Sequence, residues 1–487
     1  MIYDYIVIGA GAAGLSFSAL MEQKGFSVAL LESHSLPGGC ASYYERNGNT
    51  FDVGATTLSG LKPGRSLDVL IKTLDLKLEI KNIDPGIVSL FKSKSVNRYG
   101  DHEKWIKELQ DKFPHINHTK FWNLIAKIDN EGWQLSSRLK NVPMRSIDDL
   151  LDFSAGKIFK AVKLLPYFVK NVSSYLDGIE DPEYKALINE ILFITAQNNM
   201  EDTPILMGSM GLNYPADTGY AMGGMKTFVE ALATKCSHKF YRHQVLSVIS
   251  ADKGKDGFLV ETNKGNFSGK HVVSTLPIWN HEKIFERDQD LKKFFSTNNS
   301  NNSIDDCWSA FMIYLTIPLN VARNSLYYQM HCDPIPNCGT TSFFVSISHP
   351  EDRSRANSLE KQVVTISTHT KPDLWMKLSK EDYKIKKNET ADFILAEFMK
   401  YFSLSLQELG EIQTGSPTTF IKYTKRFKGL VGGIPHSIKR NPLKMAISKS
   451  PVDNFYLIGD TQFPGQGIGA VVMGAQNLVH HLTKSHK

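Results

Sequence analysis

The chain has 487 residues, of which 41% are hydrophobic and 22% are charged, and its formal net charge is +6. This composition is typical of a globular protein long enough for two domains, and it excludes a disordered chain. The small positive charge gives no argument for nucleic acid as a partner, and the five cysteines lack any CxxC pair or metal-ligand spacing. We therefore expect a protein of a reducing compartment, with no metal site and no nucleic-acid partner.

A βαβ unit is predicted at the start of the chain. A strand of the buried type runs from Tyr5 to Ile8, a helix from Leu15 to Gln23, and a second strand from Ser27 to Leu31. The turn between the first strand and the helix is rich in glycine. This pattern indicates the beginning of a Rossmann-like domain.

The glycine-rich turn has the GxGxxG spacing of dinucleotide-binding proteins. Gly9 permits the turn, Gly11 lets a pyrophosphate approach the backbone, and Gly14 lets the helix pack closely on the strand. The helix N-terminus then faces the anion. Glu32 ends the second strand, where a carboxylate accepts hydrogen bonds from ribose hydroxyls and disfavours the extra phosphate of NADP. FAD and NAD both remain open at this point.

The next segment, LPGGCASYYERNGNTFDVGATTLSGL, runs from Leu36 to Leu61 and supplies a Gly38-Gly39 pair followed by a short hairpin. Together with the GxGxxG turn and Glu32, it resembles the flavoprotein family of phytoene desaturases, carotene cis-trans isomerases and retinol saturases, which is related to the amine oxidases. The unbroken run is most similar to the isomerase and saturase branch. The resemblance implies that the cofactor is FAD, and no second GxGxxG unit appears that would hold NAD(P)H beside it.

The end of the chain, GDTQFPGQGIGAVVMGAQNLV, is also rich in glycine. A strand is predicted from Asn454 to Ile458, followed by Gly459 and Asp460, whose carboxylate is placed for ribityl hydroxyls. Gly465, Gly467 and Gly469 would then let the backbone and a second helix N-terminus approach the isoalloxazine ring. By the resemblance, this strand, loop and helix close the FAD site, so the two ends of the chain build one site.

The residues expected to contact FAD come from these segments and from one strand in the middle of the chain. The role of Val245, whose backbone would pair with adenine, rests on the resemblance alone. The predicted contacts are Gly9, Gly11, Ala12, Ala13, Gly14, Glu32, Ser33, Gly38, Gly39, Cys40, Ala55, Thr56, Val245, Gly459, Asp460, Gly467 and Ile468.

The resemblance implies an α/β fold, with a Rossmann-like FAD-binding domain and an α+β substrate-binding cap of the amine oxidase and phytoene desaturase type. The FAD-binding domain is expected to be discontinuous, over residues 1–79, 216–285 and 426–487. The cap is expected over residues 80–215, which are largely helical in pattern, and 286–425, which contain β-rich runs.

A basic amphipathic segment is predicted from Phe153 to Leu176, with an apolar stripe on one side. Such a segment either lies in a membrane interface or is a cap helix that faces the core, and Pro166 kinks or splits it. No apolar run is long enough to span a bilayer, and no cleaved signal is expected. We therefore expect a cytoplasmic protein, peripherally associated with a membrane. The segment contains four lysines, Lys157, Lys160, Lys163 and Lys170.

The resemblance implies an FAD-dependent enzyme that acts on carbon-carbon double bonds of a long apolar isoprenoid, with a carotenoid preferred to a retinoid. Desaturation, saturation and cis-trans isomerisation share the same motifs and all stay open. No catalytic dyad stands out. Thr56 and Thr57 either face the flavin or are structural, while His349, His369 and His436 are expected to be ordinary surface or hydrogen-bonded residues.

Two other functions are compatible with the same fold. A flavin amine oxidase would require paired aromatic rings in front of the flavin. A prenyl-lipid escort protein of the GDP-dissociation-inhibitor type would need no redox chemistry, and Glu32 and Asp460 argue against it because both suit a bound dinucleotide.

Overall fold

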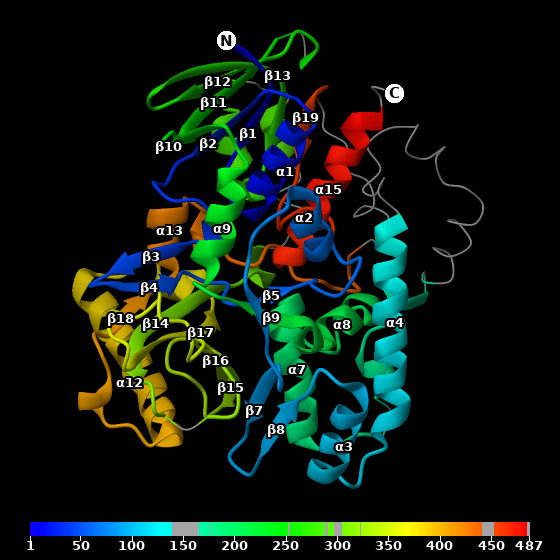
Figure 1. Ribbon diagram of the computed structural model, residues 1–487, viewed down its shortest axis with the longest axis vertical. Helices are drawn as coiled ribbons and strands as arrows, with labels where there is room; N and C mark the ends of the chain where they lie inside the picture. Colours follow the sequence, from blue (N-terminus) through cyan, green and yellow to red (C-terminus); the bar gives the residue numbers. More distant parts are fainter. Residues whose placement is uncertain are drawn as a thin grey trace.

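The computed structural model describes residues 1–138, 164, 166–176, 178–251, 254–287, 291–296, 304–321, 323–440 and 452–484. The fold is the predicted α/β fold, in which a Rossmann-like part lies above a second part with its own large sheet (Figure 1). The boundaries between the two domains stay a prediction.

The upper sheet has the order β10-β2-β1-β13-β12-β11, and β19 pairs with β13. The pairs around β1 and β2 are parallel, so the carboxyl ends of these strands meet at one edge. β19, from the end of the chain, pairs in parallel with β13. The strands are β1 (Ile2–Ile8), β2 (Val28–Glu32), β10 (His238–Tyr241), β11 (Val245–Ser250), β12 (Phe258–Thr262), β13 (Gly265–Ser274) and β19 (Phe455–Leu457).

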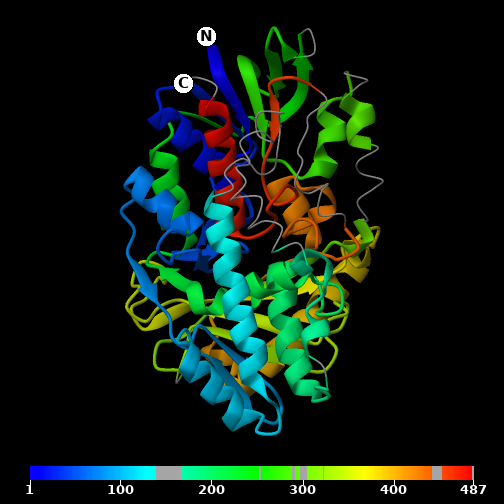
Figure 2. The same ribbon diagram turned by 90° about the vertical axis from the view of Figure 1, so that its right-hand side faces the viewer.

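Helices cover both faces of this sheet, because its central strands are apolar on both sides. In β1, Tyr5 and Val7 join a core with the helices of one face, while Ile6 and Ile8 join a second core on the other face. Figure 2 shows the helical segments on the two sides. The first face is covered by α1 (Ala12–Gln23), α2 (Ser66–Leu74), α9 (Met225–Thr234) and α15 (Ile468–Lys484), and the second includes α10 (His281–Ile284).

The lower sheet has the order β18-β14-β17-β16-β15-β7-β8. One of its faces packs on α12 (Lys380–Phe402) through a core that includes Phe311, Ile366 and Phe398. Near its edge lies α13 (Pro417–Thr424). The strands are β7 (Ile87–Leu90), β8 (Ser95–Arg98), β14 (Ser309–Pro318), β15 (Tyr327–His331), β16 (Ser342–Ile347), β17 (Lys361–Thr370) and β18 (Gln413–Gly415).

A group of helices lies beside the lower sheet and forms a core of its own around Trp122, Tyr184 and Ile188. These helices are α3 (His102–Lys112), α4 (His118–Arg138), α7 (Pro182–Ala196) and α8 (Ile205–Leu212). Short strands join the two parts of the molecule, namely β3 (Tyr43–Arg46), β4 (Asn49–Asp52), β5 (Leu58–Ser59), β6 (Ile80–Asn82) and β9 (Thr218–Ala221).

Half of the predicted amphipathic segment Phe153–Leu176 lies outside the described residues, including Lys157, Lys160 and Lys163. Of its described apolar stripe, Val172 and Leu176 are buried in the helical core, and Val169 is exposed. This end of the segment therefore faces the core. Across the part of the chain that the structure describes, no helix has the length and apolar character needed to cross a membrane.

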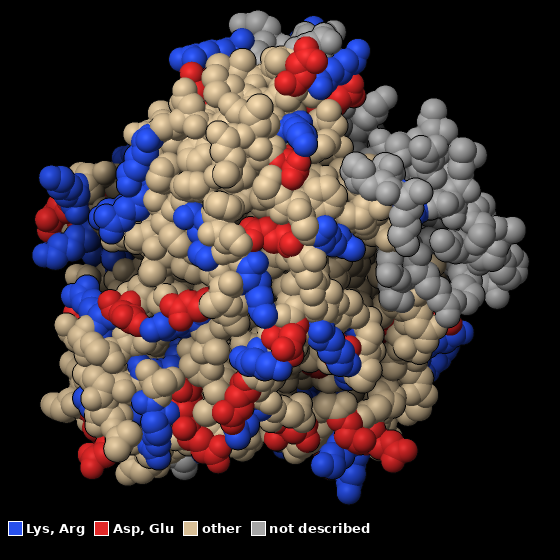
Figure 3. Space-filling view, turned by 45° about the horizontal axis from the view of Figure 1, so that its top comes forward, with Lys and Arg blue, Asp and Glu red and all other residues tan. Residues whose placement is uncertain are grey.

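Charged side chains of both signs are interspersed on the face shown in Figure 3, as the small net charge leads one to expect. The described residues contain no group of three or more histidine, cysteine, aspartate or glutamate side chains that could hold a metal ion.

Candidate cofactor-binding site

The turn between β1 and α1 forms the first wall of the site. Gly9 has a φ of +101°, which a residue with a side chain rarely adopts, and a Cβ on Gly14 would lie 2.0 Å from the carbonyl oxygen of Gly9. A Cβ on Gly11, in contrast, would meet nothing within 4 Å. No side chain caps the start of α1, so its first N–H groups are open to an anion. As predicted, Gly9 therefore permits the turn, Gly14 permits the close packing of the helix, and Gly11 leaves open space beside the backbone.

Glu32 lies at the carboxyl end of β2, beside this turn. One carboxylate oxygen accepts a hydrogen bond from the backbone N–H of Ala10 at 2.8 Å, and the other accepts from the N–H of His34 at 2.7 Å. The Ser33 hydroxyl donates to the same second oxygen at 3.1 Å. These bonds fix the carboxylate at the cavity, where its remaining lone pairs suit ribose hydroxyls.

The Gly38-Gly39 pair brings the next segment against the glycine turn. The N–H of Gly38 donates to the carbonyl of Ala10 at 2.7 Å, and Gly38 has a φ of +110°. Cys40 follows and lines the cavity. Burial raises the pKa of its thiol, while Arg426 acts in the opposite direction, so the thiol is protonated at neutral pH. Cys40 is thus a packing residue of the wall and lacks the thiolate that a nucleophile needs.

The loop after β19 brings the end of the chain to the same cavity. Asp460 accepts a hydrogen bond from the Arg426 guanidinium at 2.7 Å, and both side chains are largely buried. Burial by itself lowers the pKa of Arg426, but the attraction of Asp460 reverses this effect and the pKa is raised. Arg426 therefore holds one carboxylate oxygen of Asp460, which leaves the other for a ligand hydroxyl. Arg426 was missed in the sequence, where it lies in the run TKRFKG among other basic residues.

The start of α15 offers polar groups that have no partner. Gly467 has a φ of +90°, and a Cβ there would meet nothing within 4 Å. The Nε2 of Gln466, just before it, is buried and makes no hydrogen bond with any described residue. A buried amide donor without a partner costs free energy unless a ligand accepts from it. The edge of the cavity at α15 is therefore suited to a ligand with hydrogen-bond acceptor atoms, such as the isoalloxazine ring.

A cavity of about 1460 Å³ brings the predicted residues together. Fifteen of the seventeen line it, from Gly9 near the start of the chain to Ile468 near its end. Gly14 does not, because it packs α1 on β1. Thr56 does not either: it is buried, and its carbonyl accepts from the Tyr327 hydroxyl at 3.3 Å. Thr57 hydrogen-bonds with the Tyr214 hydroxyl. Both threonines therefore make structural contacts, which is one of the two roles expected for them.

The opposite wall comes from the lower part of the molecule. It includes Ile194 from α7, Gln197 just after the end of α7, Met312 from β14, and His369 from β17. Gln197 is 3% exposed and its Oε1 has no hydrogen-bond partner among the described residues. Burial lowers the pKa of His369 to about 4, so its ring is neutral near pH 7. His369, which the sequence led us to regard as ordinary, therefore presents a neutral imidazole at the cavity.

His369 lies among aromatic rings. Its centroid is 4.3 Å from that of Phe193 and 6.2 Å from that of Trp308. Tyr44 and Tyr314, which also line the cavity, meet edge to face at 5.2 Å with an interplanar angle of 85°. The cavity therefore contains a pair of aromatic rings, and the amine oxidase alternative stays open.

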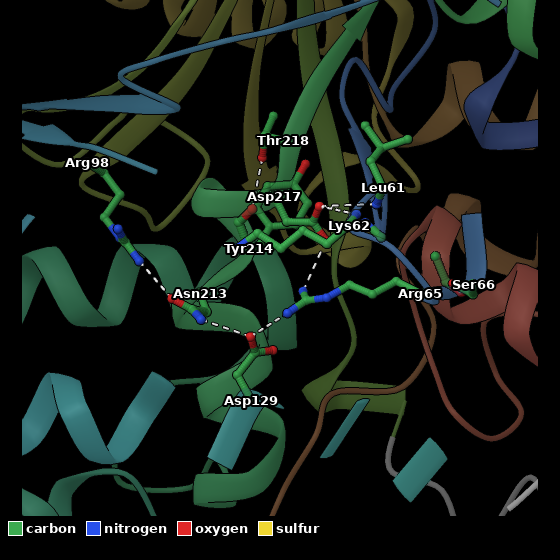
Figure 4. A network of polar contacts seen from close by, with 12 residues as sticks. Leu61, Lys62, Arg65, Ser66, Arg98, Asp129, Asn213, Tyr214, Asp217 and Thr218 are labelled. Carbon is green, nitrogen blue, oxygen red and sulfur yellow. Dashed lines mark hydrogen bonds and ion pairs between the residues drawn. The ribbon is translucent and has the colours of Figure 1, made fainter. Parts of the chain in front are cut away.

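A buried network of charges connects the two parts of the molecule behind this site (Figure 4). The Arg65 guanidinium, just before α2, forms ion pairs with Asp129 of α4 at 2.7 Å and with Asp217 at 3.0 Å. Asn213 donates to Asp129 at 2.8 Å and accepts from Arg98 at 2.9 Å. The network thus fixes the loop before α2 to the helices below it.

The same loop also holds the start of α15. Asp217 accepts hydrogen bonds from the backbone N–H groups of Gly60, Leu61 and Lys62 at 2.9 to 3.1 Å. Ser66, next to Arg65, donates to the carbonyl of Gly469 in the first turn of α15 at 2.6 Å. The position of the α15 N-terminus therefore depends on side chains outside the glycine motifs.

Known proteins resemble this chain over almost its full length. The family described as "NAD(P)-binding Rossmann-like domain" matches residues 7–74. A prolycopene isomerase of Daucus carota is 28% identical over 508 residues, which cover 99% of this chain and 80% of that protein. An all-trans-retinol 13,14-reductase of Rattus norvegicus is 21% identical, with coverage of 96% and 84%. The chain is related to these enzymes.

The predicted resemblance is thereby confirmed, and with it a Rossmann dinucleotide-binding domain. Among solved structures, wild-type putrescine oxidase bound to putrescine superposes with a TM-score of 0.66 at 14% identity, with coverage of 99% of both chains. At that identity the likeness shows the fold alone, which is the flavoenzyme fold predicted from the sequence.

Proposed function

We propose that the chain is an FAD-dependent oxidoreductase or isomerase that acts on carbon-carbon double bonds of a long apolar isoprenoid, with a carotenoid preferred to a retinoid. The observation that carries the proposal is the cavity lined by Glu32 and Asp460, from opposite ends of the chain, and by apolar side chains below them that include Ile194, Ala310 and Met312. The relatives whose names include prolycopene isomerase and retinol reductase support the substrate class.

The residues at the cavity suit FAD group by group. The open N-terminus of α1, next to Gly11, would bind the pyrophosphate. Glu32 would accept from the ribose and Asp460 from the ribityl chain, while the backbone of Val245, which also lines the cavity, would pair with the adenine. The unpartnered amide of Gln466 would donate to the ring system at the N-terminus of α15.

When bound, the flavin supplies two-electron chemistry at its ring. The chain's own contribution is to hold a polyene and to exclude water. Ile194, Ala310 and Met312 give an apolar surface on the lower wall, and His369 lines the wall as well. A conjugated chain spreads charge along its length, so the reaction does not demand a dedicated base.

The first test is the absorption spectrum of the purified protein, in which we expect flavin bands and the bands of any co-purified polyene. The second is incubation with poly-cis and all-trans carotenoids, each with oxidised and with reduced flavin. A change in the polyene supports the proposal and also distinguishes desaturation, saturation and isomerisation. No change in any polyene, with flavin bound, would refute the activity but leave the cofactor in place.

The same preparations test the alternatives. Release of hydrogen peroxide on addition of amines would favour an amine oxidase. A colourless protein that cannot be reconstituted with FAD would favour a prenyl-lipid escort. Because polyenes of this size are essentially insoluble, we further propose that the protein works in the cytoplasm at the surface of a membrane.

A further inference from the structure

A group of large apolar side chains is exposed on one side of the lower part. The exposed fractions of these residues range from 36% to 48%, in a protein where most side chains of this kind are buried. They come from two short 3-10 helices, η7 (Pro372–Trp375) and η9 (Phe427–Gly429), and from α12, α13 and the turn before α12. The residues are Leu374, Leu378, Ile385, Tyr423 and Phe427.

These elements lie next to one another. Lys428 of η9 forms an ion pair with Asp373 of η7 at 2.8 Å. The Tyr383 hydroxyl of α12 hydrogen-bonds with Ser416 at 2.7 Å and with Thr418 at 2.9 Å, at the start of α13. Figure 1 shows α12 and α13 on the same side of the molecule. The apolar side chains therefore belong to one surface.

Exposed lysines accompany the apolar side chains. Residues 371–387 and 422–428 contain nine lysines and only three acidic residues. Of these carboxylates, Asp373 is paired with Lys428, and Asp382 accepts from Ser379 at the start of α12. We call this surface the α12–α13 face, and define it by the five apolar residues above and by the exposed lysines Lys377, Lys380, Lys384, Lys422 and Lys425.

The cavity reaches the surface at this face. Lys422, Tyr423 and Lys425 are exposed and also line the cavity, as do Tyr383 and Lys387 of α12. An apolar molecule that leaves a bilayer at the α12–α13 face would therefore enter the cavity without crossing water.

We propose that the α12–α13 face docks on the headgroup region of a bilayer that contains anionic lipids. Exposed apolar side chains mixed with lysines are the composition of an interfacial surface, in which the apolar groups enter the acyl boundary and the ammonium groups meet the phosphates. Lysine is depleted from the centres of protein-protein interfaces, which favours a membrane over a protein as the occupant. The role of the face in substrate entry rests on the proposed function, but the docking itself does not.

This face is on a different side of the molecule from the described end, residues 166–176, of the segment that the sequence led us to consider. In Figure 1, α12 and α13 lie at the left, whereas α4, next to the described end of that segment, lies at the right. Val172 and Leu176 of the segment are buried in the helical core and are unavailable to a membrane.

The test is co-sedimentation with vesicles of phosphatidylcholine, alone or mixed with phosphatidylglycerol. We expect the unaltered protein to bind the mixed vesicles more tightly, and salt to weaken this binding. The variant Lys377→Glu/Lys380→Glu/Lys384→Glu alters three lysines that do not line the cavity, two of them near the N-terminus of α12, where acidic residues are tolerated. Each lysine contributes about a fivefold factor, so binding to mixed vesicles should weaken by about a hundredfold.

Two further variants complete the test. Leu374→Ser/Leu378→Ser/Phe427→Ser should weaken binding to both kinds of vesicle, because it removes apolar contacts. Lys104→Glu/Lys107→Glu/Lys120→Glu, on the exposed surface of α3 and α4, is the matched control and should bind like the unaltered protein. Unchanged melting temperature and flavin content establish that each variant is folded.

Equal binding by the first lysine variant and the unaltered protein would overturn the proposal. So would loss of binding on changing Lys157, Lys160, Lys163 and Lys170 to glutamate while both α12–α13 variants still bind. Conversion of a detergent-dispersed polyene separates the two proposals. A protein that docks through this face but converts no polyene retains the docking surface and loses the proposed activity.

Discussion

The two walls of the cavity are built from different chemical groups, which are mainly backbone atoms in the upper wall and side chains in the lower wall. The upper wall is largely backbone: Gly11 and Gly467 leave open space, and no side chain caps the first N–H groups of α1. The lower wall is made of side chains on or just after α7, on β14 and on β17, such as Gln197 and His369. A wall of backbone needs glycine at fixed spacings and so has a motif, whereas a wall of side chains accepts many residue types and has none. The comparison teaches that a cofactor site can be read from a sequence more easily than the substrate site beside it.

The largest expected effect comes from the buried charge network behind the site. Arg65→Met would leave Asp129 and Asp217 buried without a cation, since their side chains are 2% and 3% exposed. Removing one member of such a buried pair costs about 3–5 kcal/mol. We expect a large drop in melting temperature and weaker flavin binding, because the start of α15 loses its support. Both are measured by thermal unfolding with and without FAD.

The matched control for this network is Lys72→Met. Lys72 pairs with Asp68 at 2.6 Å, but its side chain is 68% exposed, and exposed pairs contribute only about 0–1 kcal/mol. Similar losses of stability in Arg65→Met and Lys72→Met would show that the buried network stabilises the fold no more than an exposed ion pair does.

The next effect separates the two roles of glycine in the upper wall. Gly14→Ala places a Cβ 2.0 Å from the Gly9 carbonyl oxygen and should cost about 1–3 kcal/mol of stability even without cofactor. Gly11→Ala places a Cβ in open space, so the cofactor-free protein should keep its stability and lose only flavin affinity. The measurements are melting temperature without FAD and flavin content. An unaffected flavin content in Gly11→Ala would contradict the assigned pyrophosphate position.

Two carboxylates should contribute similar amounts to FAD affinity, although they come from opposite ends of the chain. Glu32→Ala and Asp460→Ala each remove an acceptor for sugar hydroxyls, which is worth about 1–3 kcal/mol of FAD affinity. Titration calorimetry measures the change, and Glu103→Ala on the exposed surface of α3 serves as a control. Unchanged affinity in both site variants would refute the FAD site.

The smallest effect concerns a histidine behind the upper wall. Burial lowers the pKa of His281 to about 4, and its ring bonds to Ser274 at 2.8 Å and to the Ile278 carbonyl at 3.2 Å. The unfolded chain, with a histidine pKa of about 6.5, binds the proton more readily, so this stability is complete above about pH 6.5 and is lost as the pH falls toward 4. We expect a loss of about 1 kcal/mol per pH unit in that window.

The measurement is the free energy of unfolding in urea between pH 7 and pH 5. His281→Asn should make the dependence on pH less steep than in the unaltered protein. Equal slopes in the two proteins would show that His281 is not buried as a neutral ring.

Several elements were predictable because local pattern and tertiary role agree. The glycine turn, the strand that ends at Glu32 and the helix after Gly467 all appear where the sequence placed them. The short strands β6, β7 and β8 were missed in a region whose pattern is largely helical. β6 and β7 pair with strands far along the chain, β9 and β15, and β8 in turn pairs with β7. The burial of Val172 and Leu176 could not be foreseen either, since an amphipathic stripe has the same pattern whether it faces a core or a lipid surface.

The sequence by itself determined the Rossmann-like fold, the relationship to prolycopene isomerases and retinol reductases, and the fifteen predicted residues that meet in one cavity. It could do so because glycine and acidic residues at set spacings are required by backbone geometry, which acts over a few residues. Only the tertiary structure decided that Arg426 holds Asp460, that His369 faces the cavity, and that the cavity opens at the α12–α13 face. These depend on side chains brought together from distant segments, and pairing over such distances leaves no local pattern.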